Sequence, residues 1–149
     1  MILSDSGSFG ASNGKYISYL YKNGLGLEFY IASDEAVSNA TLTVRIALDN
    51  EFENAMTLSD KDWQIIVNGK ALDFGSVTLS ESKFKDMIVI NNVSLEKGAN
   101  VIRLLTSNSR NPLGNAGTYS GSAPIVDCIK INTSSVLAWD ENYGLPANV

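Results

Sequence analysis

Histidine is absent from the 149 residues, and cysteine occurs once, as Cys128. Without histidine the chain lacks the commonest general base and the usual transition-metal ligand, and Ser-His and Cys-His nucleophile pairs are excluded. A single cysteine also excludes an intrachain disulfide and a thiolate zinc cluster, so we expect Cys128 to be a small buried apolar residue. An enzyme built on this sequence would have to use carboxylates, lysine or tyrosine.

Charged residues are scarce as well, at 18% of the chain, and long apolar runs are missing. The 11 basic and 16 acidic side chains give a net charge of −5 with no basic cluster, which argues against a nucleic-acid partner. No run approaches the roughly 18 apolar residues of a membrane span, so we expect no membrane partner. The hydrophobic content of 44% is ordinary and predicts a folded core. We expect a monomer with one domain over residues 1–149.

The two ends of the chain look abrupt. Residues 1–10 lack the cationic start and apolar run of a signal peptide, and the sequence stops just as abruptly at the other end, in residues 137–149. We therefore expect a module excised from a larger, multimodular protein.

Helical periodicity is a third missing feature, and alternation with period two recurs in its place. Residues 41–48 alternate apolar and polar side chains, as a strand with one buried face does. Residues 100–106 do the same, with Ile102 and Leu104 on one face. Asn68-Gly69 and Gly98 predict tight turns between strands. Further strands are predicted at residues 15–21, 27–32, 63–67, 76–80, 87–95 and 125–131. Eight or more short strands predict an all-β antiparallel sandwich.

Two long polar segments, residues 49–62 and 107–124, interrupt the strands and are predicted as loops. Loops of this length are usually functional or disordered. In the second loop, amide side chains can both donate to and accept from sugar hydroxyls, and Tyr119 can stack on a sugar ring. The residues predicted to form hydrogen bonds with sugar hydroxyls are Asn108, Asn111 and Asn115. The alternative is a solvated surface loop, in which Asn, Gly and Ser are common.

The first loop adds Asn50 and Phe52 to the candidate sugar-binding residues. Phe52 stands among carboxylates, so it either packs into the core or faces a ligand. Glu51 paired with Asp49, Glu53 or Asp62 could in principle serve as the two carboxylates of a glycosidase. Acids in a polar loop are usually solvated, and this is the least favoured of the functions considered.

Asp127 lies in a predicted strand on the same face as three isoleucines, Ile125, Ile129 and Ile131. A carboxylate on an apolar face is costly unless it is paired. Its partner is either a calcium ion or an arginine with backbone amides, and the sequence leaves both open.

Several ordered fragments carry a resemblance to a known family. These are GKYISY (residues 14–19), LEF (27–29), ATLTVRIA (40–47), VNG (67–69), VSLEKGANVIRL (93–104) and IVDCIKI (125–131). The set, in this order, resembles the carbohydrate-binding modules of families six and thirty-five. The KGAN turn followed by VIRL and the aspartate strand is its most specific part.

The resemblance implies a galactose-binding-like β-sandwich, a lectin-like jelly roll that binds polysaccharide or oligosaccharide without catalysis. It also implies an extracellular location and an attached catalytic module that degrades glycans. Members commonly hold a structural calcium ion between an aspartate matching Asp127 and a Glu-x-Glu sequence in the first strand. This chain opens with Met1-Ile2-Leu3-Ser4-Asp5 instead, so the metal site departs from the pattern. Ile125 and Phe84 stand where members often have asparagine and tryptophan.

The favoured function is therefore glycan binding through the two long loops. A protein-interaction or cell-surface adhesion module is the first alternative, with Phe52, Phe84 and Trp139 as an exposed apolar patch. Trp63 is predicted to pack inward. The segment around Trp139 either covers a strand edge or starts a linker. Sugar identity, linkage and chain-end or internal binding are not encoded in any of these patterns.

Overall fold

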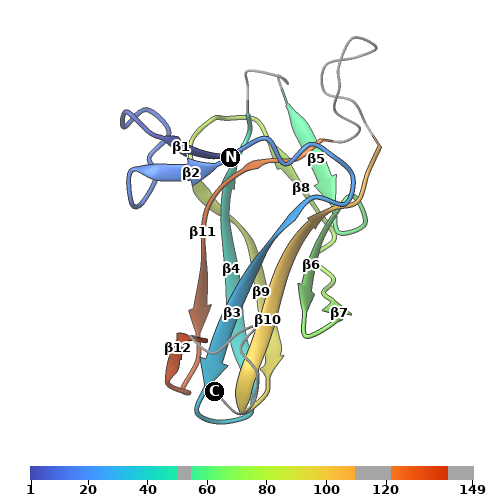
Figure 1. Ribbon diagram of the computed structural model, residues 1–149. Coiled ribbons are helices and arrows are strands. Elements are labelled where there is room, and N and C mark those ends of the chain that lie inside the picture. The colour runs from blue at the N-terminus through green and yellow to red at the C-terminus, as the bar shows by residue number, and fades with distance from the viewer. Residues whose placement is uncertain (50–54, 110–121, 141–149) are drawn as a thin grey trace.

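The computed structural model describes residues 1–49, 55–109 and 122–140, and every regular element in these ranges is a β-strand (Figure 1). None of the described segments forms a helix with the length and apolar character of a membrane crossing. The strands are β1 (Ile2–Ser4), β2 (Lys15–Ile17), β3 (Gly26–Ser33), β4 (Val37–Ala47), β5 (Met56–Ser59), β6 (Trp63–Val67), β7 (Lys70–Ala71), β8 (Ser76–Leu79), β9 (Lys85–Leu95), β10 (Gly98–Thr106), β11 (Ile125–Asn132) and β12 (Leu137–Trp139).

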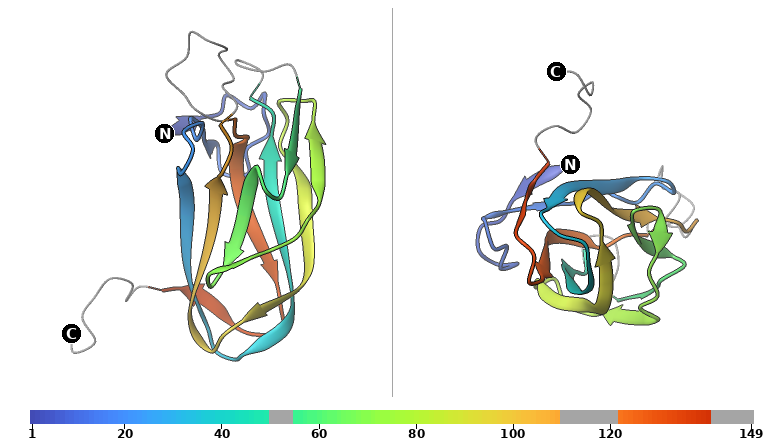
Figure 2. Two further views of the ribbon diagram at one scale, coloured as in Figure 1. Left: turned by 90° about the vertical axis from the view of Figure 1, so that its right-hand side faces the viewer. Right: turned by 90° about the horizontal axis from the view of Figure 1, so that it is seen from below.

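Two five-stranded sheets face each other and form a sandwich (Figures 1 and 2). Sheet A has the order β1-β2-β11-β4-β9, and sheet B has the order β12-β3-β10-β6-β7. All pairs within them are antiparallel. A separate antiparallel pair joins β5 and β8. The chain crosses directly between the sheets at β2–β3, β3–β4, β9–β10, β10–β11 and β11–β12. The predicted all-β sandwich is confirmed.

The core lies between the two sheets and follows the predicted alternation. In β4 the inward residues Leu42, Val44 and Ile46 are buried. In β10 the buried residues are Ile102 and Leu104, together with the polar ends Asn100 and Thr106. Period-two alternation identified these residues because one face of each strand is covered by the opposite sheet. Trp63 is buried as predicted.

The two predicted turns are present. Asn68 and Gly69 have positive φ angles of 50° and 82° between β6 and β7, the backbone that favours Asn-Gly in a tight hairpin. Gly98 has a φ of 90° where the chain passes from β9 to β10. This left-handed conformation is cheap only for glycine, which explains the residue at that position.

Some predicted boundaries are wrong. The strand predicted at residues 15–21 ends at Ile17, because Tyr19 has a φ of 64° and breaks the alternation. The loop predicted at residues 49–62 contains β5, which pairs with β8. Phe84 is buried, so it takes no part in an exposed apolar patch. Residues 137–139 form β12 on the edge of β3, which selects edge covering over a linker for these three residues.

Candidate functional site

The described residues that flank the two predicted sugar-binding loops meet at one end of the sandwich. The chain leaves β4 beside the start of β11, since Ala47 pairs with Ile125. The chain after β10 lies beside the β5–β6 connection, where the Ser107 N–H donates to the Asp62 carbonyl at 2.8 Å. We call this the loop end, which is uppermost in Figure 1. It comprises residues 18–25, 48–49, 61–62, 106–109 and 122–124.

Five of the six predicted sugar-binding residues lie outside the described residues. They are Asn50, Phe52, Asn111, Asn115 and Tyr119. Their roles stay predictions. What the structure does show is that described residues flanking both segments lie at the same end of the molecule.

Asn108, the sixth candidate, lies within the described residues and is 7% exposed. Its side-chain amide donates to the carbonyls of Asp62 at 3.0 Å and Ser122 at 2.8 Å, and its Oδ1 accepts from the Ser122 N–H at 2.7 Å. These bonds tie together the two ends of the segment 109–121. Asn108 is therefore a positioning residue at the base of this segment, and the predicted contact with sugar is not how its amide is used here.

Asp49, which the sequence offered only as a glycosidase carboxylate, lies at the loop end with two tyrosines that the sequence patterns did not single out. The Asp49 Oδ2 accepts from the Tyr21 hydroxyl at 2.5 Å and from the Ser18 hydroxyl at 3.0 Å. Tyr19 packs edge-on against Tyr21, with ring centroids 6.4 Å apart. The positive φ of Tyr19 sends the chain out of β2 toward this end. No sequence pattern signals a left-handed tyrosine, which is rare outside turns.

Asp127 sits at a β-bulge in β11, where the pairing with β4 shifts between Val126 and Cys128. Its side chain is 1% exposed. Arg45 Nε donates to Oδ2 at 2.9 Å, and the Ser12 N–H and hydroxyl each donate to Oδ1 at 3.0 Å. The bulge also corrects the predicted face: Ile125 joins a cluster outside sheet A, whereas Ile129 and Ile131 pack on the main core.

Comparison with solved structures relates this fold to carbohydrate-binding modules of family 35. The family 35 module of Cellvibrio japonicus Abf62 superposes with a TM-score of 0.62 at 15% identity, covering 93% of this chain and 85% of that one. The family 35 module Xyl-CBM35, in complex with a glucuronic-acid-containing disaccharide, gives 0.61 at 16% identity, covering 93% and 86%. A Clostridium thermocellum family 35 module gives 0.59 at 20% identity, covering 89% and 87%.

The fold is that of a family 35 carbohydrate-binding module. No protein-family model and no curated protein matches the sequence. The likeness to family 35 therefore rests on three-dimensional structure, and it extends over nearly the whole chain.

The calcium ion implied by the family resemblance does not fit the residues around Asp127. Both carboxylate oxygens already accept hydrogen bonds, and one of the donors is a cationic guanidinium. Calcium prefers six to eight oxygen ligands, several of them charged. Among residues 1–49, 55–109 and 122–140 no group of three or more acidic, cysteine or histidine side chains could hold a metal. Of the two alternatives left open for Asp127, the structure shows the arginine and backbone amide.

Cys128, the neighbour of Asp127, is half-buried rather than fully buried. Burial raises the pKa of its thiol, and the negative charge of Asp127 raises it further. The thiol therefore stays protonated near neutral pH, as expected of a residue with a packing role.

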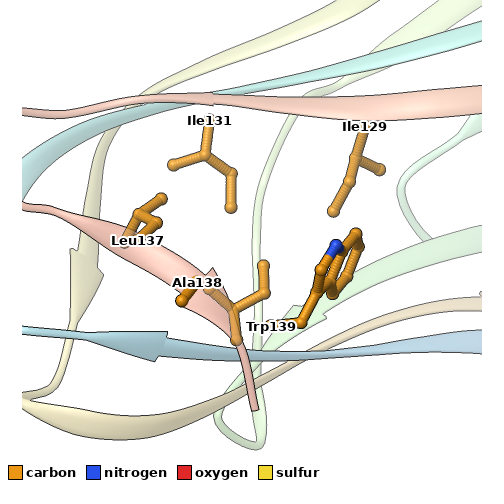
Figure 3. A pocket seen from close by; sticks show the side chains of 6 residues that line it. Ile129, Ile131, Leu137, Ala138 and Trp139 are labelled. Carbon is orange, nitrogen blue, oxygen red and sulfur yellow. The ribbon is translucent and has the colours of Figure 1, made fainter. Parts of the chain in front are cut away.

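An apolar groove of about 280 Å³ lies away from the loop end, between β11 and β12 (Figure 3). Ile129 and Ile131 line one wall, and Leu137, Ala138 and Trp139 line the other. Trp139 is 68% exposed although its backbone is fixed by pairing with Ile31. Of the three residues in the predicted apolar patch, Trp139 is exposed, Phe84 is buried and Phe52 lies outside the described residues.

Proposed function

We propose that this protein is a non-catalytic carbohydrate-binding module that binds polysaccharide or oligosaccharide at the loop end. The observation that carries the proposal is that the described flanks of both polar, aromatic-containing segments meet at one end of a sandwich with the family 35 fold. One similar module is described in complex with a glucuronic-acid-containing disaccharide. We propose that this chain likewise binds a glycan, with an acidic sugar among the candidates.

Within this proposal the Tyr119 ring stacks on a sugar ring, and the side-chain amides of Asn111 and Asn115 form hydrogen bonds with sugar hydroxyls. Asn50 and Phe52 contribute from the neighbouring segment. An aromatic face and neutral amides bind sugars without bringing a charge that needs a counterion. Asn108 holds the base of the second segment through hydrogen bonds to Asp62 and Ser122.

We further propose that the module acts outside the cell and directs an attached glycan-degrading enzyme to its substrate. The Asp49 carboxylate at the loop end supports a binding rather than a hydrolytic role, because it accepts hydrogen bonds from two neighbouring hydroxyls. A glycosidase needs one carboxyl kept protonated by its surroundings and a second placed across the bond. A panel of chromogenic glycosides should give no turnover with the purified protein.

The test of sugar binding compares Tyr119→Ala with Tyr30→Ala on a broad glycan array and by affinity electrophoresis. Tyr30 lies in β3, where its hydroxyl bonds to Glu28, so it controls for the loss of a tyrosine elsewhere. We expect the wild type and Y30A to bind the same glycans and Y119A to lose most of its affinity with little change in melting temperature. Full binding by Y119A would remove that residue from the site. Retention on no glycan at all would overturn the function.

A protein-interaction module remains the second candidate, favoured by the groove around Trp139. An exposed indole on a rigid strand is typical of interface anchors. Trp139→Ala separates the two candidates, because glycan binding at the loop end should not change. A protein that sediments as a dimer, and as a monomer after W139A, would support the interaction function and contradict the expected monomer.

A further inference from the structure

The N-terminal segment folds over the outer face of sheet A. We call residues 5–14 the N-terminal cover. The Asp5 carboxylate closes this segment on itself by accepting the N–H groups of Gly7, Phe9 and Ala11 at 2.8–3.2 Å. Phe9 packs edge-on against Tyr16 with ring centroids 5.4 Å apart. The Phe9 carbonyl also accepts the Phe84 N–H at 2.9 Å.

Beneath the cover lies a second apolar cluster, separate from the main core. Its buried members are Tyr16, Ala47, Phe84 and Ile125. The cover keeps water from this cluster, so its attachment to the sheet contributes to folding. The cover also makes polar contacts with the sheet at Gly10 and Ser12, on either side of Ala11, which packs against the cluster.

Those polar contacts centre on the buried carboxylate of Asp127 and the side chain of Arg45. Arg45 Nε bonds to Asp127 at 2.9 Å, and its Nη2 donates to the Gly10 carbonyl at 3.3 Å. Its Nη1 also lies 3.7 Å from Asp86. The Ser12 N–H reaches both oxygens of Asp127, at 3.0 and 3.2 Å. Arg45 therefore bonds both to sheet A, through Asp127, and to the N-terminal cover, through Gly10.

A carboxylate as buried as Asp127 needs a compensating positive charge. We infer that the Arg45 guanidinium is the fixed cation of this site, and that it fastens the N-terminal cover to sheet A without a divalent metal. The planar guanidinium has five donors and cannot lose its charge in a protein. Its positive charge also repels a second cation, so Arg45 keeps a calcium ion from binding beside Asp127.

The first experiment measures the melting temperature of the wild type after chelation, then in millimolar calcium or in excess EDTA. A ligand that binds only the folded state raises stability by mass action. We expect the two melting temperatures to agree, and glycan binding, where present, to be equal in both buffers. A rise of several degrees on adding calcium would overturn the inference.

The second experiment compares Arg45→Met with the matched control Arg103→Met. Arg103 pairs with Glu28 at 3.6 Å on the surface, and their side chains are 42% and 40% exposed. Losing Arg45 leaves the buried Asp127 carboxylate without its cation, so R45M should lower the melting temperature by about 10 °C. R103M should lower it by no more than about 2 °C. Equal losses would contradict a special role for Arg45.

A third measurement separates this role from general destabilisation. Asp127→Asn removes the charge that needs Arg45, so R45M should cost less in a D127N background than in the wild type. Hydrogen exchange of the Ser12 amide should accelerate in R45M at a temperature where β4 and β10 stay protected. Additive losses in the double variant, or unchanged exchange at Ser12, would overturn the assignment. None of these outcomes depends on which sugar, if any, the protein binds.

Discussion

Asn100 shows how one buried amide can hold two turns. Its Oδ1 accepts the Glu96 N–H and the Asn68 side-chain amide, each at 2.8 Å. Its Nδ2 donates to the carbonyls of Glu96 at 2.9 Å and Gly98 at 3.0 Å. The β9–β10 turn is thereby fixed to the β6–β7 hairpin. This gives a physical reason for the asparagine that follows Lys-Gly-Ala in the most specific fragment of the sequence resemblance.

Replacing Asn100 by alanine should therefore destabilise the protein. The change removes a buried side-chain amide that makes four hydrogen bonds, to Asn68, Glu96 and Gly98, at a cost of about 2 kcal/mol in the free energy of unfolding. Urea denaturation followed by tryptophan fluorescence measures this. The control is Asn91→Ala, since Asn91 is exposed and bonds to Thr41 on the surface. Equal midpoints for the two variants would show that the buried network contributes nothing.

The thiol of Cys128 should react slowly in the folded protein. Burial and the adjacent Asp127 carboxylate raise its pKa, and only the thiolate attacks alkylating reagents. Labelling with iodoacetamide at pH 8 should be at least about tenfold slower in buffer than in 8 M urea, where the thiol regains its ordinary pKa. Similar rates in the two conditions would contradict the raised pKa.

At the scale of elements, β12 depends on a carboxylate outside it. Asp34 Oδ1 accepts the Ser135 hydroxyl at 2.5 Å and the Val136 N–H at 2.8 Å. Ser135 in turn bonds to the Ser33 hydroxyl at 2.6 Å. These contacts place the β11–β12 turn beside the end of β3, so that the three residues of β12 can pair with that strand.

Asp34→Ala should loosen β12 while most of the sandwich stays folded. A three-residue edge strand has little pairing of its own, so loss of the turn contacts releases it locally. Hydrogen exchange at Val136 and Trp139 should quicken by about tenfold, with protection in β4 and β10 unchanged. The neighbouring variant Glu35→Gln is the control, because Glu35 contributes its backbone to this cluster. Unchanged exchange in D34A would show that β12 is held by pairing alone.

The strands also show which elements could be predicted from sequence patterns and which could not. Period-two alternation predicted β4 and β10 because both bury one face against the opposite sheet. It failed at Tyr19 and at Asp127, where a positive φ and a β-bulge reverse the face of the next residue. β5 was missed because it lies inside a segment whose polar composition predicted a loop, whereas its equally short partner β8 falls within the predicted strand 76–80.

The candidate site was harder to predict from the sequence than the strands were. Polar composition pointed to two segments, and the fold brings their described flanks together. Composition could not show that the amide of Asn108 is buried, or that the Asp49 carboxylate accepts a hydrogen bond from the Tyr21 hydroxyl. Such facts depend on contacts between residues that are far apart along the chain.

At the scale of the whole molecule, two aspartates link stability to pH at opposite ends of the sandwich. Asp5 lies in the N-terminal cover, and its pKa is lowered from the ordinary 3.8, chiefly by the Ala11 backbone N–H. The Asp34 pKa is lowered chiefly by the Ser135 hydroxyl. β1, which precedes Asp5, and β12, which Asp34 anchors, lie at opposite ends in Figure 1.

A carboxyl whose pKa is lower in the folded state binds fewer protons when folded, so stability rises with pH across its titration. The contribution of both aspartates is complete well above pH 3.8 and is lost as the pH falls through their lowered folded values. The melting temperature of the wild type should therefore drop steeply below about pH 4.5. The double variant D5A/D34A should melt lower at pH 7 and show a shallower fall in acid. Curves that fall in parallel between pH 7 and pH 2.5 would show that other carboxyls control acid unfolding.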